Sequence, residues 1–212
     1  MVEKKKKNAY HHGNLRPALI NAGLEILSKD GISGLSIRKA ARWAGVSHTA
    51  PYRHFQSKHD LIDAIAEEGF RMLTDALNGV LSKEYPTYFD RLAAAGTAYV
   101  TFARTYPSHL HVMFSKERKR IIPETLSERT PTNAFAPILE IIKKGQNQGF
   151  IRRDKSSYFL ALTYWTVMHG LSGILNEEQL LGTTKTDAEL AKQLMEVAFF
   201  GSGADGSESD IG

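Results

Sequence analysis

Apolar residues recur along this chain at helical rather than strand spacing. Leu15, Leu19, Ala22 and Ile26 lie four, three and four residues apart, so they line one face of a helix from about residue 14 to about residue 29. Similar spacing predicts further helices at about 58–81, 88–106, 109–115, 132–150, 154–175 and 187–200. Because no segment shows a convincing strand pattern, the fold is predicted to be all-α.

Residues 34–58 predict two short helices joined by a tight turn. Ser36 can cap the first helix, and Gly45 can end it, since glycine takes the left-handed conformation without a Cβ clash. The second helix is expected to start at residue 47 or 48, with Pro51 in its first turn, where the missing N–H costs little. This arrangement is the helix-turn-helix of DNA-binding proteins, whose second helix enters the major groove. Similar corners also occur in all-α proteins that bind no DNA.

Charge favours the DNA-binding interpretation. Residues 1–60 contain 11 Lys and Arg against 4 Asp and Glu, a net charge of +7, whereas the rest of the chain holds 16 against 19, a net charge of −3. The basic excess therefore coincides with the predicted helix-turn-helix, as phosphate binding requires.

The same residues resemble a known family. The run from Leu35 to Leu61 contains A-x-x-A-G-V-S, then Y-R-H-F, then S-K-x-D-L, and it is similar to the DNA-binding domain of TetR/AcrR transcription regulators. Pro51 replaces the more usual Leu before Tyr. The resemblance implies a three-helix DNA-binding domain at residues 14–60, followed at residues 61–200 by a helical bundle for ligand binding and dimerisation.

The family motif also assigns candidate DNA contacts. Matching positions implies that Arg38, His48 and Thr49 contact base edges, since Arg pairs with guanine and the Thr methyl meets a thymine methyl. The remaining candidates hold phosphate or flank the motif: Ser36, Ser47, Tyr52, Arg53, His54 and Lys58. Alternatively, Tyr52 and His54 pack the small domain, as is expected of Phe55.

A second segment resembles one TetR subfamily. Trp165, His169 and Gly170 form a Trp-x-x-x-His-Gly motif, which is similar to that of regulators with a WHG domain. The resemblance implies that this helix and the last one form a homodimer interface around a small-molecule effector site. The predicted effector contacts are Tyr99, Phe102, Met113, Phe114, Trp165 and His169. The alternative is that these side chains are core, with His169 hydrogen-bonded structurally.

Composition excludes several other classes. The 212 residues include no cysteine, which excludes disulfides and thiolate metal sites, and neither a metal nor a cofactor is expected. No Gly-rich phosphate loop, G-x-S-x-G or H-E-x-x-H motif occurs, so the protein is not expected to be an enzyme. The 18 uncharged residues 158–175 reach the lower limit of a membrane span, but their polar side chains favour a central or interface helix.

The two ends of the chain are polar. Residues 1–13 are basic and lack periodicity, so they form either a solvated tail or an arm on DNA, and the Lys4–Lys7 run is not a secretory signal. Residues 201–212 are a Gly/Ser/Asp tail that is expected to be disordered.

Together these features predict a cytoplasmic one-component transcriptional regulator, by family default a repressor. It would bind a roughly palindromic double-stranded DNA operator as a dimer, with affinity modulated by an unidentified small molecule. The alternative is a non-specific architectural DNA-binding protein without an effector. A third possibility is an enzyme with a vestigial DNA-binding domain.

Overall fold

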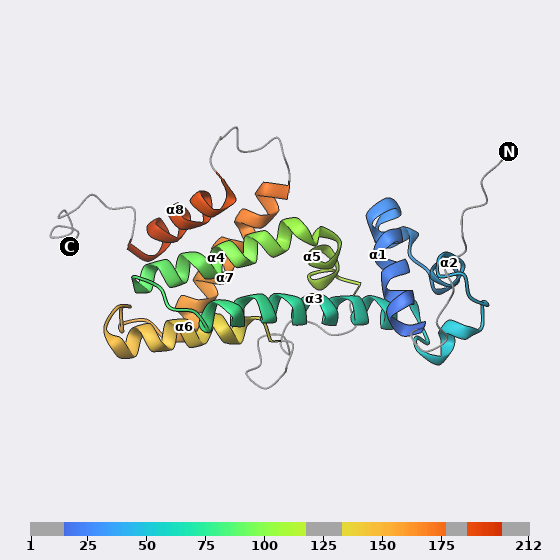
Figure 1. The fold of residues 1–212 in the computed structure, drawn as a ribbon, viewed down its shortest axis with the longest axis horizontal. Helices are drawn as coiled ribbons and strands as arrows, with labels where there is room; N and C mark the ends of the chain where they lie inside the picture. The colour runs from blue at the N-terminus through green and yellow to red at the C-terminus, as the bar shows by residue number, and fades with distance from the viewer. Residues whose placement is uncertain (1–14, 118–132, 177–185, 201–212) are drawn as a thin grey trace. The chain divides into compact units, whose positions relative to one another are not determined.

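The structure, a computed structural model, describes residues 15–117, 133–176 and 186–200. Within these ranges the chain is α-helical with one 3-10 turn and no strand, so the all-α prediction is confirmed (Figure 1). The elements are α1 (Leu15–Gly34), α2 (Ile37–Trp43), η1 (Ala50–Arg53), α3 (Lys58–Leu81), α4 (Tyr88–Thr105), α5 (Pro107–Met113), α6 (Phe135–Gln148), α7 (Ser157–Asn176) and α8 (Asp187–Phe200). The basic arm at 1–13 and the tail at 201–212 lie outside the described residues.

The described residues form two compact units. The N-terminal unit comprises residues 15–66 and 112–117, and the C-terminal unit comprises residues 67–111, 133–176 and 186–200. Helix α3 contributes its first residues to the N-terminal unit and the remainder to the C-terminal unit.

The N-terminal unit packs α1 against α2 and η1 around a small apolar core. Gly23 of α1 lets the chain approach α3 closely, because a Cβ there would lie 2.9 Å from Cδ1 of Ile65. Leu19 and Ile26, which the helical spacing placed on one face of the first helix, are buried in this core. Residues from later segments complete it, among them Leu35, Ala40, Phe55, Leu61 and Ile65. Phe55 is only 2% exposed, which confirms its expected place in the core.

Local signals in the sequence set the helix ends of this unit. The Ser36 hydroxyl accepts a hydrogen bond from the Lys39 backbone N–H at 3.2 Å, and Gly45 follows α2 with a φ of 70°. Ser57 and Asp60 form a reciprocal capping box, with distances of 3.2 Å and 2.9 Å. The Ser36 cap and the Gly45 helix end were predicted from the sequence, and the structure confirms both.

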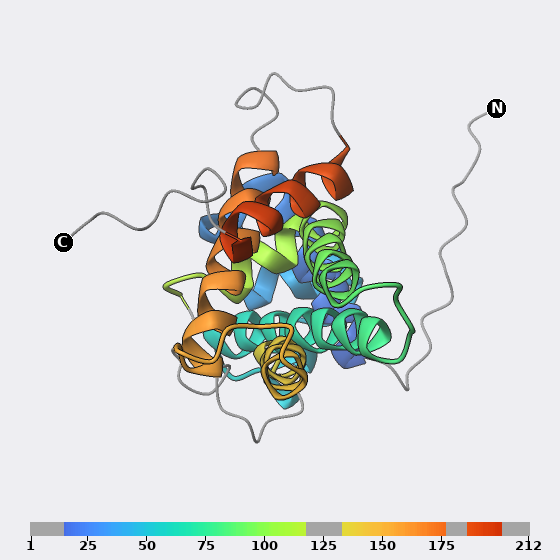
Figure 2. The same cartoon turned by 90° about the vertical axis from the view of Figure 1, so that its left-hand side faces the viewer.

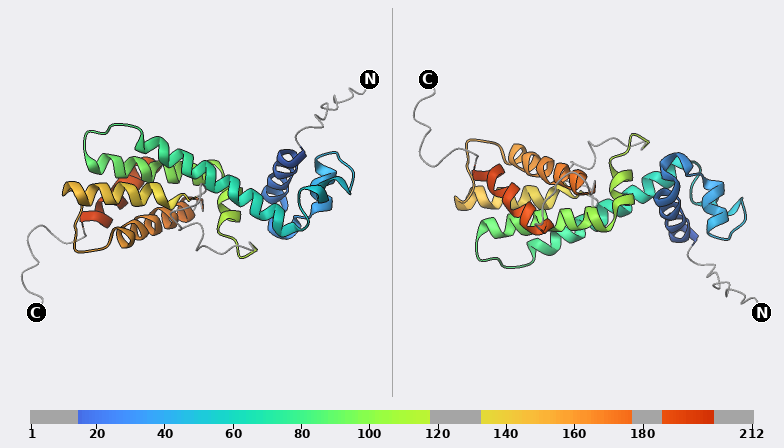
Figure 3. Two further views of the ribbon diagram at one scale, coloured as in Figure 1. Left: turned by 90° about the horizontal axis from the view of Figure 1, so that it is seen from below. Right: turned by 90° about the horizontal axis from the view of Figure 1, so that it is seen from above.

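In the C-terminal unit α4 packs against α6, α7 and α8 (Figure 2). Helix α7 also packs against α6 and α8, and Figure 3 shows α6 and α7 side by side. Close contact between α4 and α7 requires Gly96, where a Cβ would lie 2.7 Å from the Met168 sulfur. The largest side chains of this core are fully buried: Tyr99, Tyr164, Phe135 and Ile138.

Among the described residues, no helix has the length and apolarity that would cross a membrane.

Candidate nucleic-acid interface and effector sites

The segment after α2 differs from the expected helix. Within residues 47–54 the only helical element is the 3-10 turn η1 (Ala50–Arg53). The Ala50 N–H donates to the Ser47 carbonyl, and the Tyr52 N–H donates to the Thr49 carbonyl. Pro51 explains the difference, because it has no N–H to bond back along the chain and disfavours the α conformation of the residue before it. The turn is closed by the Pro51 carbonyl, which accepts from the N–H groups of His54 and Phe55, both at 2.9 Å.

The predicted DNA contacts lie at the surface of the N-terminal unit. Arg38 in the first turn of α2, and His48 and Thr49 before η1, are exposed. Tyr52 is 46% exposed and His54 is exposed too, so neither side chain is buried in the core of the small domain. The other exposed candidates are Ser36, Ser47 and Arg53.

Two of the candidates also hold the fold together. The Ser36 hydroxyl is occupied as the cap of α2. Lys58 is partly buried, and its ammonium donates to the Ile32 carbonyl at 2.6 Å, which ties the start of α3 to the end of α1. An ammonium has three donors, so this bond leaves Lys58 able to contact a phosphate as well.

An exposed aromatic residue beside this surface was not singled out from the sequence. Trp43 at the end of α2 is 45% exposed, and the Lys29 ammonium lies 4.5 Å from its ring centroid.

The structure brings together three of the predicted effector contacts. The Tyr99 hydroxyl lies 2.9 Å from His169 Nδ1, and the rings of Tyr99 and Trp165 meet edge to face at 5.1 Å. Burial raises the pKa of Tyr99 and lowers the pKa of His169, so both groups are neutral at neutral pH. Phe102, one turn further along α4, is buried, whereas Met113 and Phe114 belong to the N-terminal unit.

Two cavities are prominent in the described part of the C-terminal unit. The first, of about 860 Å³, lies between α3 and α4 and has small side chains on its walls, among them Ala76, Gly79, Ala94 and Ala98, with Phe102 and Tyr106 at one side. The second, of about 720 Å³, lies where the start of α4 meets the α6–α7 loop, and we call it the loop cavity. It is lined by Pro86, Thr87, Tyr88, Phe89, Leu92, Phe150, Ile151, Arg152, Lys155, Phe159, Leu160, Thr163 and Ala198. None of these residues was predicted as an effector contact, although the cluster Phe150, Arg152, Lys155 and Phe159 combines aromatic and basic residues in the sequence.

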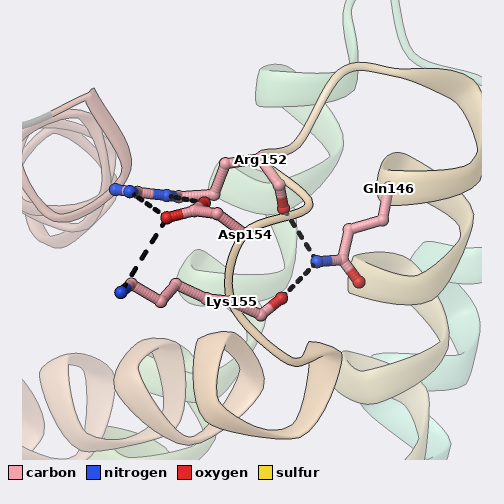
Figure 4. A network of polar contacts seen from close by, with 4 residues as sticks. All are labelled: Gln146, Arg152, Asp154 and Lys155. Atoms are coloured by element: carbon pink, nitrogen blue, oxygen red, sulfur yellow. Dashed lines mark hydrogen bonds and ion pairs between the residues drawn. The ribbon is translucent and has the colours of Figure 1, made fainter.

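A buried glutamine organises the loop beside this cavity (Figure 4). The side-chain amide of Gln146 donates to the carbonyls of Arg152 and Lys155, at 2.7 Å and 2.8 Å, and its oxygen accepts from the Ser157 hydroxyl at 2.6 Å. Asp154 lies between the side chains of Arg152 and Lys155. Two residues of the loop and the first residue of α7 are thus fixed to the last turn of α6.

Comparison with known proteins identifies the family. The profile of the family "Bacterial regulatory proteins, tetR family" matches residues 19–65, and that of the "Tetracyclin repressor-like, C-terminal domain" family matches residues 92–198. The chain belongs to the TetR family of bacterial regulatory proteins. It is therefore a DNA-binding regulator of the helix-turn-helix type, which confirms the family predicted from residues 35–61.

Individual relatives agree with this assignment. The nucleoid occlusion factor SlmA of Vibrio cholerae serotype O1 is 30% identical over 57% of this chain and 64% of its own. A class A tetracycline repressor protein of Escherichia coli is 45% identical over 23% of each chain. The matches thus span less than two thirds of either relative. A solved structure of a protein with unknown function from Rhodococcus sp. RHA1 superposes with a TM-score of 0.73 and 30% identity, over 91% of this chain and 97% of that one.

No metal site was expected from the sequence. In the part of the chain that the structure describes, no three His, Asp or Glu side chains are grouped so that they could hold a metal ion.

Proposed function

We propose that this TetR-family protein is a one-component repressor that binds a roughly palindromic operator as a homodimer and responds to a small molecule in its C-terminal unit. The observation that carries the proposal is the exposure of Arg38, His48, Thr49, Tyr52 and Arg53 on two consecutive segments. These side chains lie outside the apolar core of their unit, so they are available to a partner.

Within this surface the residues divide by chemistry. Arg38 and the pair His48 and Thr49 are placed to read base edges, because Arg forms paired hydrogen bonds with guanine and the Thr methyl fits thymine. The other members of the surface bind phosphate and set the register without reading sequence. They are Ser36, Ser47, Tyr52, Arg53, His54 and Lys58.

Dimerisation through α7 and α8 is supported by apolar side chains that these helices leave exposed. Ile174 of α7 is 42% exposed, and Leu194 and Val197 of α8 are 39% and 52% exposed. A Cβ added at Gly170 or Gly173 would meet no atom within 4 Å, so a second helix can approach α7 closely there. A two-fold dimer would present two recognition segments to half-sites about 34 Å apart on one side of DNA.

An effector in the C-terminal unit would act through α3, which contributes to both units. A ligand that prefers one of two conformations by about 1–3 kcal/mol is enough to couple the sites. The Trp165–His169–Gly170 segment supports membership of the WHG subfamily, and the family's role as DNA-bound regulators supports a location in the bacterial cytoplasm.

The test is selection of bound sequences from random duplexes, followed by footprinting at constant salt. The proposal expects a recurrent inverted repeat, protected by a dimer, with affinity about 10³-fold or more above that for random DNA. Equal affinity for all duplexes would instead favour an architectural DNA-binding protein without an effector. That alternative is suggested by the similarity to SlmA, which is a nucleoid occlusion factor.

A further inference from the structure

The loop cavity combines an apolar wall with a cationic rim. Its wall contains the side chains of Phe89, Leu92 and Leu160, together with Phe150 and Phe159, which are 65% and 56% exposed. Contiguous exposed apolar groups of this kind mark binding sites. A volume of about 720 Å³ lies within the range of small-molecule sites, which are mostly apolar with a few placed polar groups.

The rim carries more positive than negative charge. Arg152 and Lys155 line the cavity, and both pair with one carboxylate, that of Asp154. Arg152 Nε and Nη2 each donate to Asp154 at 2.6 Å, and these hydrogen bonds hold the pKa of Asp154 below its usual range. The Lys155 ammonium lies 3.8 Å from the same carboxylate, which is too far for a hydrogen bond. Two cations with one anion leave a charge of +1 at the rim.

The rim is preformed rather than assembled by a ligand. Gln146 is only 9% exposed, and its amide holds the backbone carbonyls of the two rim residues Arg152 and Lys155. Arg153, between them, donates to the carbonyls of Gln146 and Asn147 at the end of α6. A loop fixed in this way loses little conformational entropy when it binds a ligand.

The other candidate sites of the C-terminal unit are less suited to a ligand. In the Tyr99 cluster, the hydroxyl and the imidazole already satisfy each other at 2.9 Å. The cavity of about 860 Å³ between α3 and α4 has small side chains on its walls. Its charged residues Asp75 and Lys83 have opposite signs, so it presents no net charge to a ligand.

We infer that the loop cavity binds a small organic anion with an apolar body, whose charged group is held by Lys155 and attracted by Arg152. The apolar body lies against Phe89, Leu92 and Leu160. This inference rests on the proposed function, because it assigns a site and a chemical class to the effector that the proposed function requires.

The experiment uses the full chain and competition against the fluorescent probe 8-anilinonaphthalene-1-sulfonate, itself an aromatic anion. Octanoate and its uncharged counterpart 1-octanol are the competing ligands. We expect octanoate to bind with an affinity about tenfold higher than that of 1-octanol, as measured by displacement of the probe. A hydrogen bond to a charged group contributes a free energy of that size. Lys155→Gln should weaken octanoate by about tenfold and leave 1-octanol unchanged.

Lys144→Gln is the matched control. Lys144 is exposed on α6, pairs with Glu140 and does not line the cavity, so this variant should bind octanoate like the wild type. The inference is overturned if 1-octanol binds as tightly as octanoate, if both lysine variants lose the same affinity, or if octanoate displaces no probe. Operator binding measured on the same samples separates the two claims. Retained operator binding without octanoate binding refutes only the anion site, and octanoate binding without any DNA binding refutes only the proposed regulator.

Discussion

The hydroxyl of Tyr99 on α4 lies 2.9 Å from Nδ1 of His169 on α7, although the two residues are 70 positions apart in the chain. The phenol is fully buried, and burial raises the pKa of Tyr99 far above its usual value. The pair is therefore a neutral hydrogen bond inside the C-terminal unit, next to the edge of Trp165. Its first role is to join two helices.

Tyr99→Phe should lower the free energy of unfolding by about 1–2 kcal/mol, because it removes this hydrogen bond and leaves the imidazole nitrogen without it. Urea unfolding measures the change. Tyr106→Phe is the control, since Tyr106 is 39% exposed, and exposed substitutions change stability by less than about 0.5 kcal/mol. Equal stability of the two variants would show that the Tyr99 bond contributes nothing.

Acidification should destabilise the protein through two histidines, the buried His109 and the partly buried His169. Burial lowers the pKa of His169 and of His109, whose shift is opposed by Glu68. The unfolded chain takes up these protons near the ordinary pKa of about 6.5, whereas the folded chain does so only at lower pH, so stability falls as the pH drops below that value.

The measurement is the urea midpoint at about pH 7.5 and at about pH 5.5, on either side of the unfolded pKa. The wild type should lose stability at the lower pH, and the loss should be smaller in His169→Asn, which cannot titrate. An identical pH dependence in both proteins would contradict the assignment of the effect to His169.

Gln146→Leu should destabilise the α6–α7 loop. The change removes three hydrogen bonds, to the carbonyls of Arg152 and Lys155 and from the Ser157 hydroxyl, and should cost about 1–3 kcal/mol. Amide hydrogen exchange in residues 149–157 should accelerate at the same time. Gln148→Leu, on an exposed position of the same helix, should leave both readouts unchanged, and accelerated exchange there would argue against the role of Gln146.

Gly145→Ala should also be destabilising, by about 1–3 kcal/mol as expected for overpacking. The new Cβ would lie 2.5 Å from Cε1 of Tyr88 and 2.7 Å from Cδ1 of Ile151. Gly79→Ala is the opposite case, because a Cβ there meets nothing within 4 Å. In a helix this exchange should stabilise by about 0.5–1 kcal/mol. Thermal unfolding of both variants tests the contrast, which fails if they shift in the same direction.

Arg38→Ala and Lys58→Ala should affect DNA binding differently. Loss of Arg38 should cost about 1–3 kcal/mol on the selected operator and relax preference at one base pair, because Arg38 is assigned to a base edge. Loss of Lys58 should weaken binding to all duplexes and reduce the salt slope by about 1. It should also lower stability, since Lys58 holds the Ile32 carbonyl. Titrations over a salt series measure both effects, and wild-type selectivity in Arg38→Ala would refute its assignment.

Features decided by neighbouring residues were predictable from the sequence. Ser36, Gly45 and the Ser57–Asp60 box set their helix ends through contacts within four residues, and α8 spans Asp187–Phe200 where the spacing predicted 187–200. The turn η1 is an instructive exception, because Pro51 was read as compatible with a helix start. In the structure Pro51 instead lies near the start of a 3-10 turn of only four residues, 50–53.

The candidate sites show where sequence information ends. The TetR-like motif and the basic bias of residues 1–60 pointed to the DNA-binding domain, which the family match confirms, since that domain is built from one short stretch of chain. The pairing of Tyr99 with His169 and the loop cavity join α4 to residues about 60–70 positions later. Such contacts depend on how helices pack, and helical periodicity specifies only which face is apolar, not which partner covers it. Tertiary structure alone therefore decided that three of the six predicted effector residues form one cluster, and that an apolar cavity with a cationic rim lies elsewhere in the C-terminal unit.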